Sequence, residues 1–178
     1  MKIWFLTLSL VLLSQRVFCT IEGIIRSGFP ELHVTYDGSH KASFGNDISP
    51  STASSKPSLS WNAEPEALYT VIMVDLDAPS KKDPSLSEFL HWLVVNIHGQ
   101  SINSGHELAS YRGPRPPVGS GPHRYYFLVF KQKNPIPRKD VESRPRLKTT
   151  EAAVSLGAFV GQCVNNLRYA GKTFKIFF

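Results

Sequence analysis

Three short runs of apolar, β-branched and aromatic residues constrain the fold of this chain more than any other feature. They occupy residues 69–74, 92–97 and 125–130. Each run is too short for a helix but has the length and composition of a strand that is buried on both faces. A fourth run, 32–36, alternates between the two faces of a strand and ends at Asp37-Gly38, a typical turn signal. The pattern predicts a mainly β protein with an antiparallel sheet or sandwich.

Segments rich in Pro, Gly and Ser separate these runs. Residues 48–59 are rich in Ser, Thr and Pro, and residues 113–122 read Gly-Pro-Arg-Pro-Pro-Val-Gly-Ser-Gly-Pro, which predicts a loop. Because the next strand follows at once, His123 is expected at a loop-to-strand junction, where binding groups are often placed. One short helix is expected to begin near Thr149 or Thr150 and to end before Gly157.

The N-terminus has the pattern of a secretory signal peptide. Lys2 precedes an apolar run from Ile3 to Leu13, and more polar residues follow. The run is well short of the roughly 20 residues that cross a bilayer. We therefore expect a signal peptide at 1–19, a single secreted domain at 20–178, and no transmembrane segment after processing. A chain of 178 residues, 42% of them hydrophobic, can bury one substantial core.

Charge and cysteine content limit the range of partners. Residues 1–19 hold Lys2 and Arg16 and no acid, so their removal lowers the formal net charge from +6 to +4. The basic residues are scattered except in 131–148, where they cluster among prolines and predict a solvated loop rather than a nucleic-acid surface. If Cys19 leaves with the leader, Cys163 cannot form an internal disulfide, and we expect it to be buried and inert. We expect a monomer without a nucleic-acid partner.

Five titratable residues lie where the predicted strands begin or end. Asp75 and Asp77 follow the run at 69–74, His91 precedes the run at 92–97, and His123 and Tyr125 open the last run. Residues two apart share a face if the strand continues. Two imidazoles and a phenol supply hydrogen-bond donors, and two carboxylates could orient the imidazoles, so the set suits a phosphate, sulfate or carboxylate anion.

Other interpretations of these residues remain open. Asp77 could fasten a turn, His91 could be a satisfied residue at a strand edge, and Tyr125 could belong to the core. A zinc site is disfavoured because no short His or Cys pair fixes two ligands. Hydrolysis at the carboxylate pair is disfavoured as well, since Gly119-Ser120-Gly121 lacks the spacing of a nucleophile elbow. We expect no catalysis, no metal and no cofactor.

At these positions the sequence resembles the phosphatidylethanolamine-binding protein family, also called the Raf kinase inhibitor protein family. Residues 75–80, Asp-Leu-Asp-Ala-Pro-Ser, resemble its Asp-Pro-Asp-Ala-Pro motif, and residues 121–125 resemble its Gly-x-His-Arg-Tyr motif. Residues 88–97 resemble the segment between them. The order and the separations of the three agree with the family, and the resemblance covers about 21–161.

The resemblance implies a β-sandwich with a large central sheet, a smaller sheet and a few short peripheral helices. It also implies a surface cavity for phosphate-type anions and phospholipid head groups, and a cis peptide between Ala78 and Pro79. By position, the residues that would line this cavity are Asp75, Asp77, Pro79, His91, His123 and Tyr125.

The sequence departs from the family pattern at four places. Leu76 replaces the motif proline, and Leu90 stands where many animal members have a second histidine. Arg115 occupies a position commonly held by glycine beside the ligand, where it would narrow the mouth or add a cation, and we include it in the candidate site. The ending at 162–178 also differs, so a C-terminal helix that gates the cavity is not expected, and the apolar tail forms either an extra strand or an exposed patch.

The function expected from these observations is a secreted, non-enzymatic binding protein for head groups such as phosphatidylethanolamine or for another amphipathic ligand. The alternative is an inhibitor of a serine protease or of a kinase pathway that acts through an exposed loop, for which the Pro-rich segment 113–122 is the candidate. A cytosolic kinase-regulating role conflicts with the leader.

Overall fold

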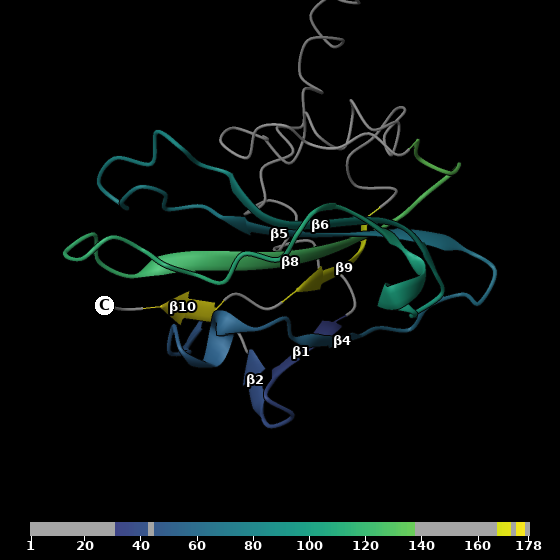
Figure 1. The fold of residues 1–178 in the computed structure, drawn as a ribbon, viewed down its shortest axis with the longest axis horizontal. Helices are drawn as coiled ribbons and strands as arrows, with labels where there is room; N and C mark the ends of the chain where they lie inside the picture. Colours follow the sequence, from purple (N-terminus) through teal and green to yellow (C-terminus); the bar gives the residue numbers. More distant parts are fainter. Residues whose placement is uncertain (1–30, 43–44, 138–166, 172–173, 177–178) are drawn as a thin grey trace, which may run out of the picture.

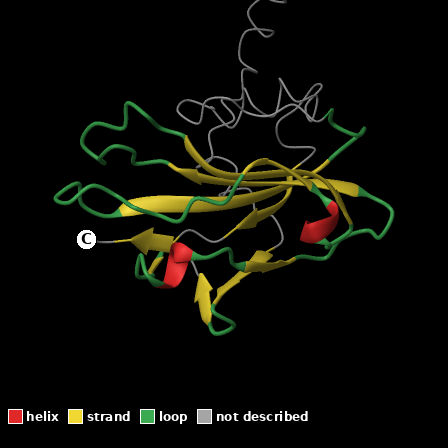
Figure 2. Cartoon of the chain, in the orientation of Figure 1, coloured by secondary structure: helices red, strands yellow, loops and turns green. Residues whose placement is uncertain are grey.

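The computed structural model describes residues 31–42, 45–137, 167–171 and 174–176. Figure 1 shows a broad layer of long strands above a layer of short ones, and Figure 2 shows that strands and loops dominate this part of the chain. In chain order the elements are β1 (Glu31–Tyr36), β2 (His40–Ala42), β3 (Asn46–Asp47), the 3₁₀ turn η1 (Thr52–Ser54), β4 (Ser58–Ser60), β5 (Leu68–Asp75), β6 (Phe89–His98), the 3₁₀ turn η2 (Ile102–Ser104), β7 (His106–Ala109), β8 (His123–Lys131), β9 (Leu167–Gly171) and β10 (Phe174–Ile176).

The large sheet has the strand order β9-β8-β5-β6-β7, and every neighbouring pair in it is antiparallel. Strand β5 lies in the middle, and all of its residues from Tyr69 to Asp75 are buried. Strands β6 and β8 flank it and are buried along almost their whole length. The three apolar runs are therefore strands that are covered on both faces, as their composition predicts.

The small sheet consists of β1 with β2 and β4 as antiparallel partners. The turn between β1 and β2 is the predicted one: Asp37 and Gly38 both have positive φ, 47° and 70°, which suits a two-stranded hairpin. A parallel pairing of β1 with β9 joins the small sheet to the large one. The predicted β-sandwich fold is confirmed, but this pairing and that of β10 with β3 are parallel, which the sequence did not indicate.

The core lies between the two layers. Alternate residues of β5, β6 and β8 point toward the short strands, as the period of two in a strand requires. Buried side chains of the core include Leu32, Val34 and Tyr36 from β1, Tyr69, Val71 and Met73 from β5, Trp92, Val94 and Ile97 from β6, and Tyr125, Phe127 and Val129 from β8.

A buried amide network fixes a bulge in β6. Asn96 has a φ of +58° and stands where the register of β6 against β5 shifts. Its Nδ2 donates to the carbonyl of Ile136 at 2.8 Å, and its Oδ1 accepts from the Ile136 amide at 2.7 Å and from Gln132 Nε2 at 2.9 Å. Asparagine adopts positive φ more readily than most residues. It therefore suits this position both by its backbone conformation and by the hydrogen bonds of its side-chain amide.

The end of the chain forms strands where it is described. Strand β8 has two partners on the same side, because its residues Leu128–Phe130 pair with β9 and its residues His123–Tyr125 pair with β10. Of the two outcomes expected for the tail, the extra strand is confirmed for 174–176. The expected leader at 1–19, the expected helix after Thr149 and Cys163 all lie outside the described residues. Within the described ranges, no helix has the length and apolar character that a membrane crossing needs.

Candidate functional site

Three neighbouring strands of the large sheet bring the predicted residues together. Asp75 is the last residue of β5, and its register partners are Phe89 on β6 and Tyr125 on β8. His91 is two residues beyond Phe89 on the same strand, and His123 is the first residue of β8. Because β5 runs against both neighbours, the end of one strand and the starts of two others meet at one edge of the sheet.

The centre of the site is a buried Asp75–His123 pair. His123 Nδ1 lies 2.7 Å from Asp75 Oδ2, and the two side chains are only 1% and 4% exposed. The other carboxylate oxygen of Asp75 accepts the backbone N–H of Asp77 at 2.8 Å. The carboxylate therefore fixes the orientation of the imidazole ring, and both of its oxygens have protein partners.

A serine hydroxyl holds the second nitrogen of this ring. Ser120 Oγ lies 2.9 Å from His123 Nε2 and 2.7 Å from the carbonyl oxygen of Pro117. A carbonyl oxygen only accepts, so the hydroxyl proton of Ser120 goes to Pro117 and is not directed at the imidazole. The chain of Ser, His and Asp has the order of a catalytic triad, but the serine hydroxyl proton is directed to a carbonyl oxygen and not to the imidazole, as a triad requires.

Aromatic rings form the wall beside the pair. The ring of Tyr125 stacks near His123 at 6.4 Å between centroids and meets His91 edge to face at 5.1 Å, and Phe89 meets His91 on its other side at 5.3 Å. The pKa of Tyr125 is raised well above its ordinary value, by burial first and by the Asp75 carboxylate second. Tyr125 is therefore a neutral phenol at physiological pH and can donate its hydroxyl proton.

Two hydrogen bonds at His91 join strand β6 to Arg112, the residue just before the Pro-rich segment. The Arg112 amide donates to the His91 carbonyl at 2.9 Å, and His91 Nδ1 donates to the Arg112 carbonyl at 2.6 Å. The Arg112 guanidinium lies over the ring of Phe89, 5.6 Å from its centroid. These contacts place the start of the Pro-rich segment against the aromatic wall.

Together these groups enclose a cavity of about 160 Å³, which we call the strand-end cavity. Its wall combines the titratable residues with an apolar side. The peptide between Ala78 and Pro79 is cis, as the resemblance implies. The lining residues are Asp75, Ala78, Pro79, Leu86, Phe89, His91, Arg112, Gly113, Arg115, Pro116, Pro117, His123 and Tyr125.

Six of the seven residues named from the sequence thus line one cavity, whereas Asp77 does not. Strand β5 ends at Asp75, so the two carboxylates do not share a face as they would on a continued strand. Both oxygens of Asp77 face Arg124 instead, with Nε at 2.8 Å, Nη2 at 2.9 Å and the backbone N–H at 2.9 Å. Burial pushes the pKa of Asp77 upward, but the hydrogen bonds and charge of Arg124 outweigh this effect and hold that pKa below its ordinary value. In this structure Asp77 fastens the turn after β5.

The sequence reasoning missed Phe89 and Arg112. Phe89 belongs to the segment whose resemblance was noted, and its place two residues before His91 on a strand was a usable signal that the two share a face. Arg112 had no such signal. It lies outside the motifs, and only the pairing of its backbone with His91 brings it to the site. Leu90, at the position of the second histidine, is buried and pairs with Val74 next to this site.

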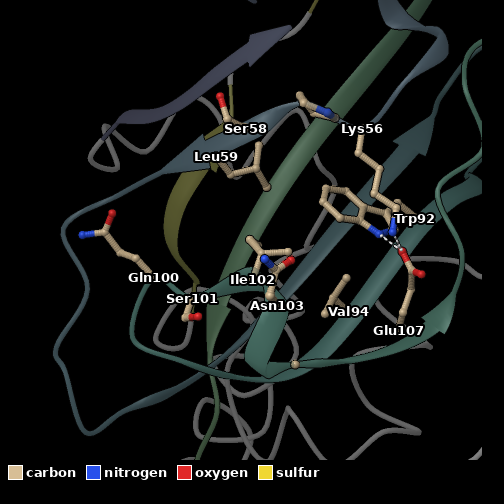
Figure 3. A pocket seen from close by; sticks show the side chains of 12 residues that line it. Lys56, Ser58, Leu59, Trp92, Val94, Gln100, Ser101, Ile102, Asn103 and Glu107 are labelled. Carbon is tan, nitrogen blue, oxygen red and sulfur yellow. Dashed lines mark hydrogen bonds and ion pairs between the residues drawn. The ribbon is translucent and has the colours of Figure 1, made fainter. Parts of the chain in front are cut away.

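The described part of the chain also has two larger hollows. One, of about 550 Å³, opens beside Trp92, where the indole N–H donates to Glu107 and Glu107 also pairs with Lys56 (Figure 3). The other, of about 570 Å³, adjoins the strand-end cavity and shares Arg112, Gly113 and Arg115 with it. In the described ranges no group of three or more His, Cys, Asp or Glu side chains is arranged to hold a metal ion. We take the strand-end cavity as the candidate site because the paired and aromatic groups converge there.

The described part of the chain is thus a β-sandwich with a small cavity at the strand ends of its large sheet. Residues 35–170 match the family described as phosphatidylethanolamine-binding protein. This chain belongs to that family.

Relatives of known structure or curated description agree with this assignment. A putative odorant-binding protein A5 of Drosophila melanogaster is 40% identical over 105 residues, which are 59% of this chain and 50% of that protein, so this chain spans about half of its length. A carboxypeptidase Y inhibitor, solved with its cognate proteinase, is 27% identical with a TM-score of 0.64 over 82% of each chain. A phosphatidylethanolamine-binding protein from Plasmodium vivax is 18% identical with a TM-score of 0.65 over 88% of this chain and 96% of that one, which shows the fold alone.

Proposed function

We propose that this protein is a non-enzymatic binding protein whose strand-end cavity takes the phosphate-type head group of a phospholipid or of another amphipathic ligand. The observation that carries this proposal is the buried Asp75–His123 pair inside a cavity that also holds His91 and Tyr125. The phosphate would take the place of the Ser120 hydroxyl at His123 Nε2, and hydrogen bonds from an imidazole N–H to anionic oxygens are about twice as strong as neutral ones.

The size of the cavity supports a head group rather than a whole lipid. A volume of about 160 Å³ is the space of roughly five waters in the liquid, well below the range typical of pockets that enclose a drug-sized ligand. The apolar part of the lining, formed by Leu86, Phe89 and the prolines, can contact the apolar part of an amphipathic ligand.

The absence of catalysis is part of the same proposal. A nucleophilic serine must pass its proton to a base, but the Ser120 proton is directed to the carbonyl oxygen of Pro117 and not to His123. We expect no turnover of ester or phosphate substrates by the purified protein. Turnover that disappears in Ser120→Ala or in Asp77→Asn would refute this part of the proposal.

The test of binding is calorimetric titration of the purified protein with inorganic phosphate and with dihexanoyl phospholipids. His123→Asn should weaken phosphate binding by about tenfold or more, since hydrogen bonds to charged groups contribute roughly 1.5 to 3 kcal/mol each. The matched control is His98→Asn, an exposed histidine at the far end of β6. Equal affinities for the wild type and His123→Asn, with thermal unfolding showing both to be folded, would overturn the assignment of the site.

A second candidate function is protease inhibition, and the similarity to the carboxypeptidase Y inhibitor over 82% of both chains favours it. The Pro-rich segment is a candidate contact surface because its Val118 is 92% exposed and prolines lower the cost of ordering a loop on binding. Stoichiometric inhibition of a serine carboxypeptidase that weakens in Val118→Asp would support this function. Full protease activity at a large excess of the protein would exclude it for that enzyme.

We also propose that the protein is secreted, on the basis of the leader pattern in residues 1–19. Expression of the full chain in a eukaryotic host should deliver it to the medium with a new N-terminus near Thr20. N-terminal sequencing of the secreted protein checks this expectation, and retention of Met1 on cell-associated protein would contradict it.

A further inference from the structure

Two arginines border the strand-end cavity, and neither is joined to a carboxylate by an ion pair in the described part of the chain. Arg112 and Arg115 both line the cavity, and both side chains belong to exposed residues. Arg112 is positioned by the two hydrogen bonds between its backbone and His91 and by its contact with Phe89. Arg115 lies between Pro114 and Pro116, which are both buried and fix the backbone on either side of it.

The negative charge in the lining is already satisfied. Asp75 is the single acidic residue among the lining residues, and its oxygens bond to His123 and to the Asp77 amide. Asp77, the nearest other acid in the sequence, is bound to Arg124. A ligand that carried an ammonium group would therefore meet two guanidinium groups at the cavity and no available carboxylate in its lining.

From this distribution of charge we infer that the strand-end cavity selects a phosphate monoester, as in phosphatidic acid, over the zwitterionic diester head group of phosphatidylethanolamine. The inference rests on the proposed function and names the ligand class of the same site. A phosphate monoester carries a charge of about −1.5 to −2 at pH 7 and offers three terminal oxygens. Guanidinium groups bind such oxygens with paired N–H donors. An ethanolamine ester has fewer terminal oxygens, and its ammonium group is repelled by the guanidinium charges.

The test compares three dihexanoyl lipids whose head groups differ in net charge, all below their micelle concentrations. They are phosphatidic acid, phosphatidylmethanol, which is a diester with one negative charge, and phosphatidylethanolamine, which is zwitterionic. Isothermal titration at pH 7.5 should give affinities that fall in this order, with about tenfold or more between the first and the last, the size of one hydrogen bond to a charged group. The order separates the effect of the second negative charge from that of the ammonium group.

Variants then locate the preference. In the double variant Arg112→Gln with Arg115→Gln, the affinity for phosphatidic acid should fall close to that for phosphatidylethanolamine. The affinity for phosphatidylethanolamine should stay about the same. The control is Lys81→Gln with Lys82→Gln, which removes the same charge from exposed residues outside the cavity lining and should keep the preference.

The outcomes distinguish this inference from the proposed function. If all three lipids bind equally and His123→Asn weakens them all, the head-group selectivity is refuted and the proposed function stands. If phosphatidylethanolamine binds most tightly, the inference is refuted in the same way. If no lipid and no phosphate binds, both fail.

Discussion

Replacement of Asp77 by alanine should destabilise the protein by about 3 kcal/mol and leave phosphate binding by the folded protein unchanged. Asp77 is 1% exposed and accepts three hydrogen bonds from Arg124. Removing one partner of a buried ion pair costs about 3 to 5 kcal/mol, and we take the lower end because the Arg124 side chain is 30% exposed and can turn toward water.

Urea denaturation followed by tryptophan fluorescence measures this change, since Trp61 and Trp92 are both buried in the core. The control is Asp83→Ala, an exposed acid in the same connection between β5 and β6, which should change the free energy of unfolding by about 0.5 kcal/mol or less. A loss below 1 kcal/mol for Asp77→Ala, or a loss of phosphate affinity as large as that of His123→Asn, would refute the structural role that we assign to this carboxylate.

The pH dependence gives an independent check of the same interaction. The pKa of Asp77 is lower in the folded protein than its ordinary value, so the unfolded state binds a proton first as the pH falls. The contribution of this carboxylate to stability is complete above about pH 4 to 5 and is lost as the pH drops through the folded pKa. Asp77→Asn should therefore unfold with a shallower dependence on pH in the acid range than the wild type.

Three further predictions concern stability. Asn96→Ala should cost about 3 kcal/mol in urea denaturation, because it strands the buried Ile136 amide and carbonyl and places alanine at a φ of +58°; a cost below 1 kcal/mol would contradict this account of the bulge. Gly105→Ala should lower stability by about 1 to 3 kcal/mol and reduce the melting temperature, since the new Cβ would lie 2.6 Å from a methyl carbon of Val94; an unchanged melting temperature would disprove the close approach. Burial raises the pKa of Tyr111 to about 12, so this phenol should contribute about 1.4 kcal/mol per pH unit to the fall in stability between pH 10 and 12, and Tyr111→Phe should reduce the slope of alkaline denaturation by that amount; equal slopes would argue against the buried phenol.

The strands could be predicted from the sequence because their composition left few alternatives. Residues 69–74, 92–97 and 125–130 all lie within β5, β6 and β8, which extend beyond them by one to three residues at an end. Those extensions matter, because they place Asp75, His91 and His123 inside strands rather than in flanking loops. Apolar periodicity cannot locate such ends, since most of the added residues, Asp75, His91 and His123 among them, are polar.

The sequence predicted most residues of the candidate site but not which of them pair with one another. The spacing of His123 and Tyr125 indicated a shared face, and their rings do stack. The two aspartates, in contrast, look equivalent in the sequence, and the fold separates them because β5 ends between them. Which carboxylate meets a histidine and which meets an arginine depends on the register of β8 against β5, and local sequence does not encode that register.

Strand β10 pairs with the start of β8, where two residues of the cavity lie. Ile176 is the register partner of His123, and Phe174 is that of Tyr125, so a short segment near the end of the chain forms part of the backbone frame under two cavity residues. A change that disrupts this ladder, such as Lys175→Pro, alters the support of those residues without touching a ligand. Fusion partners and affinity tags are therefore better attached upstream of the sandwich than after residue 176 when ligand affinities are to be measured.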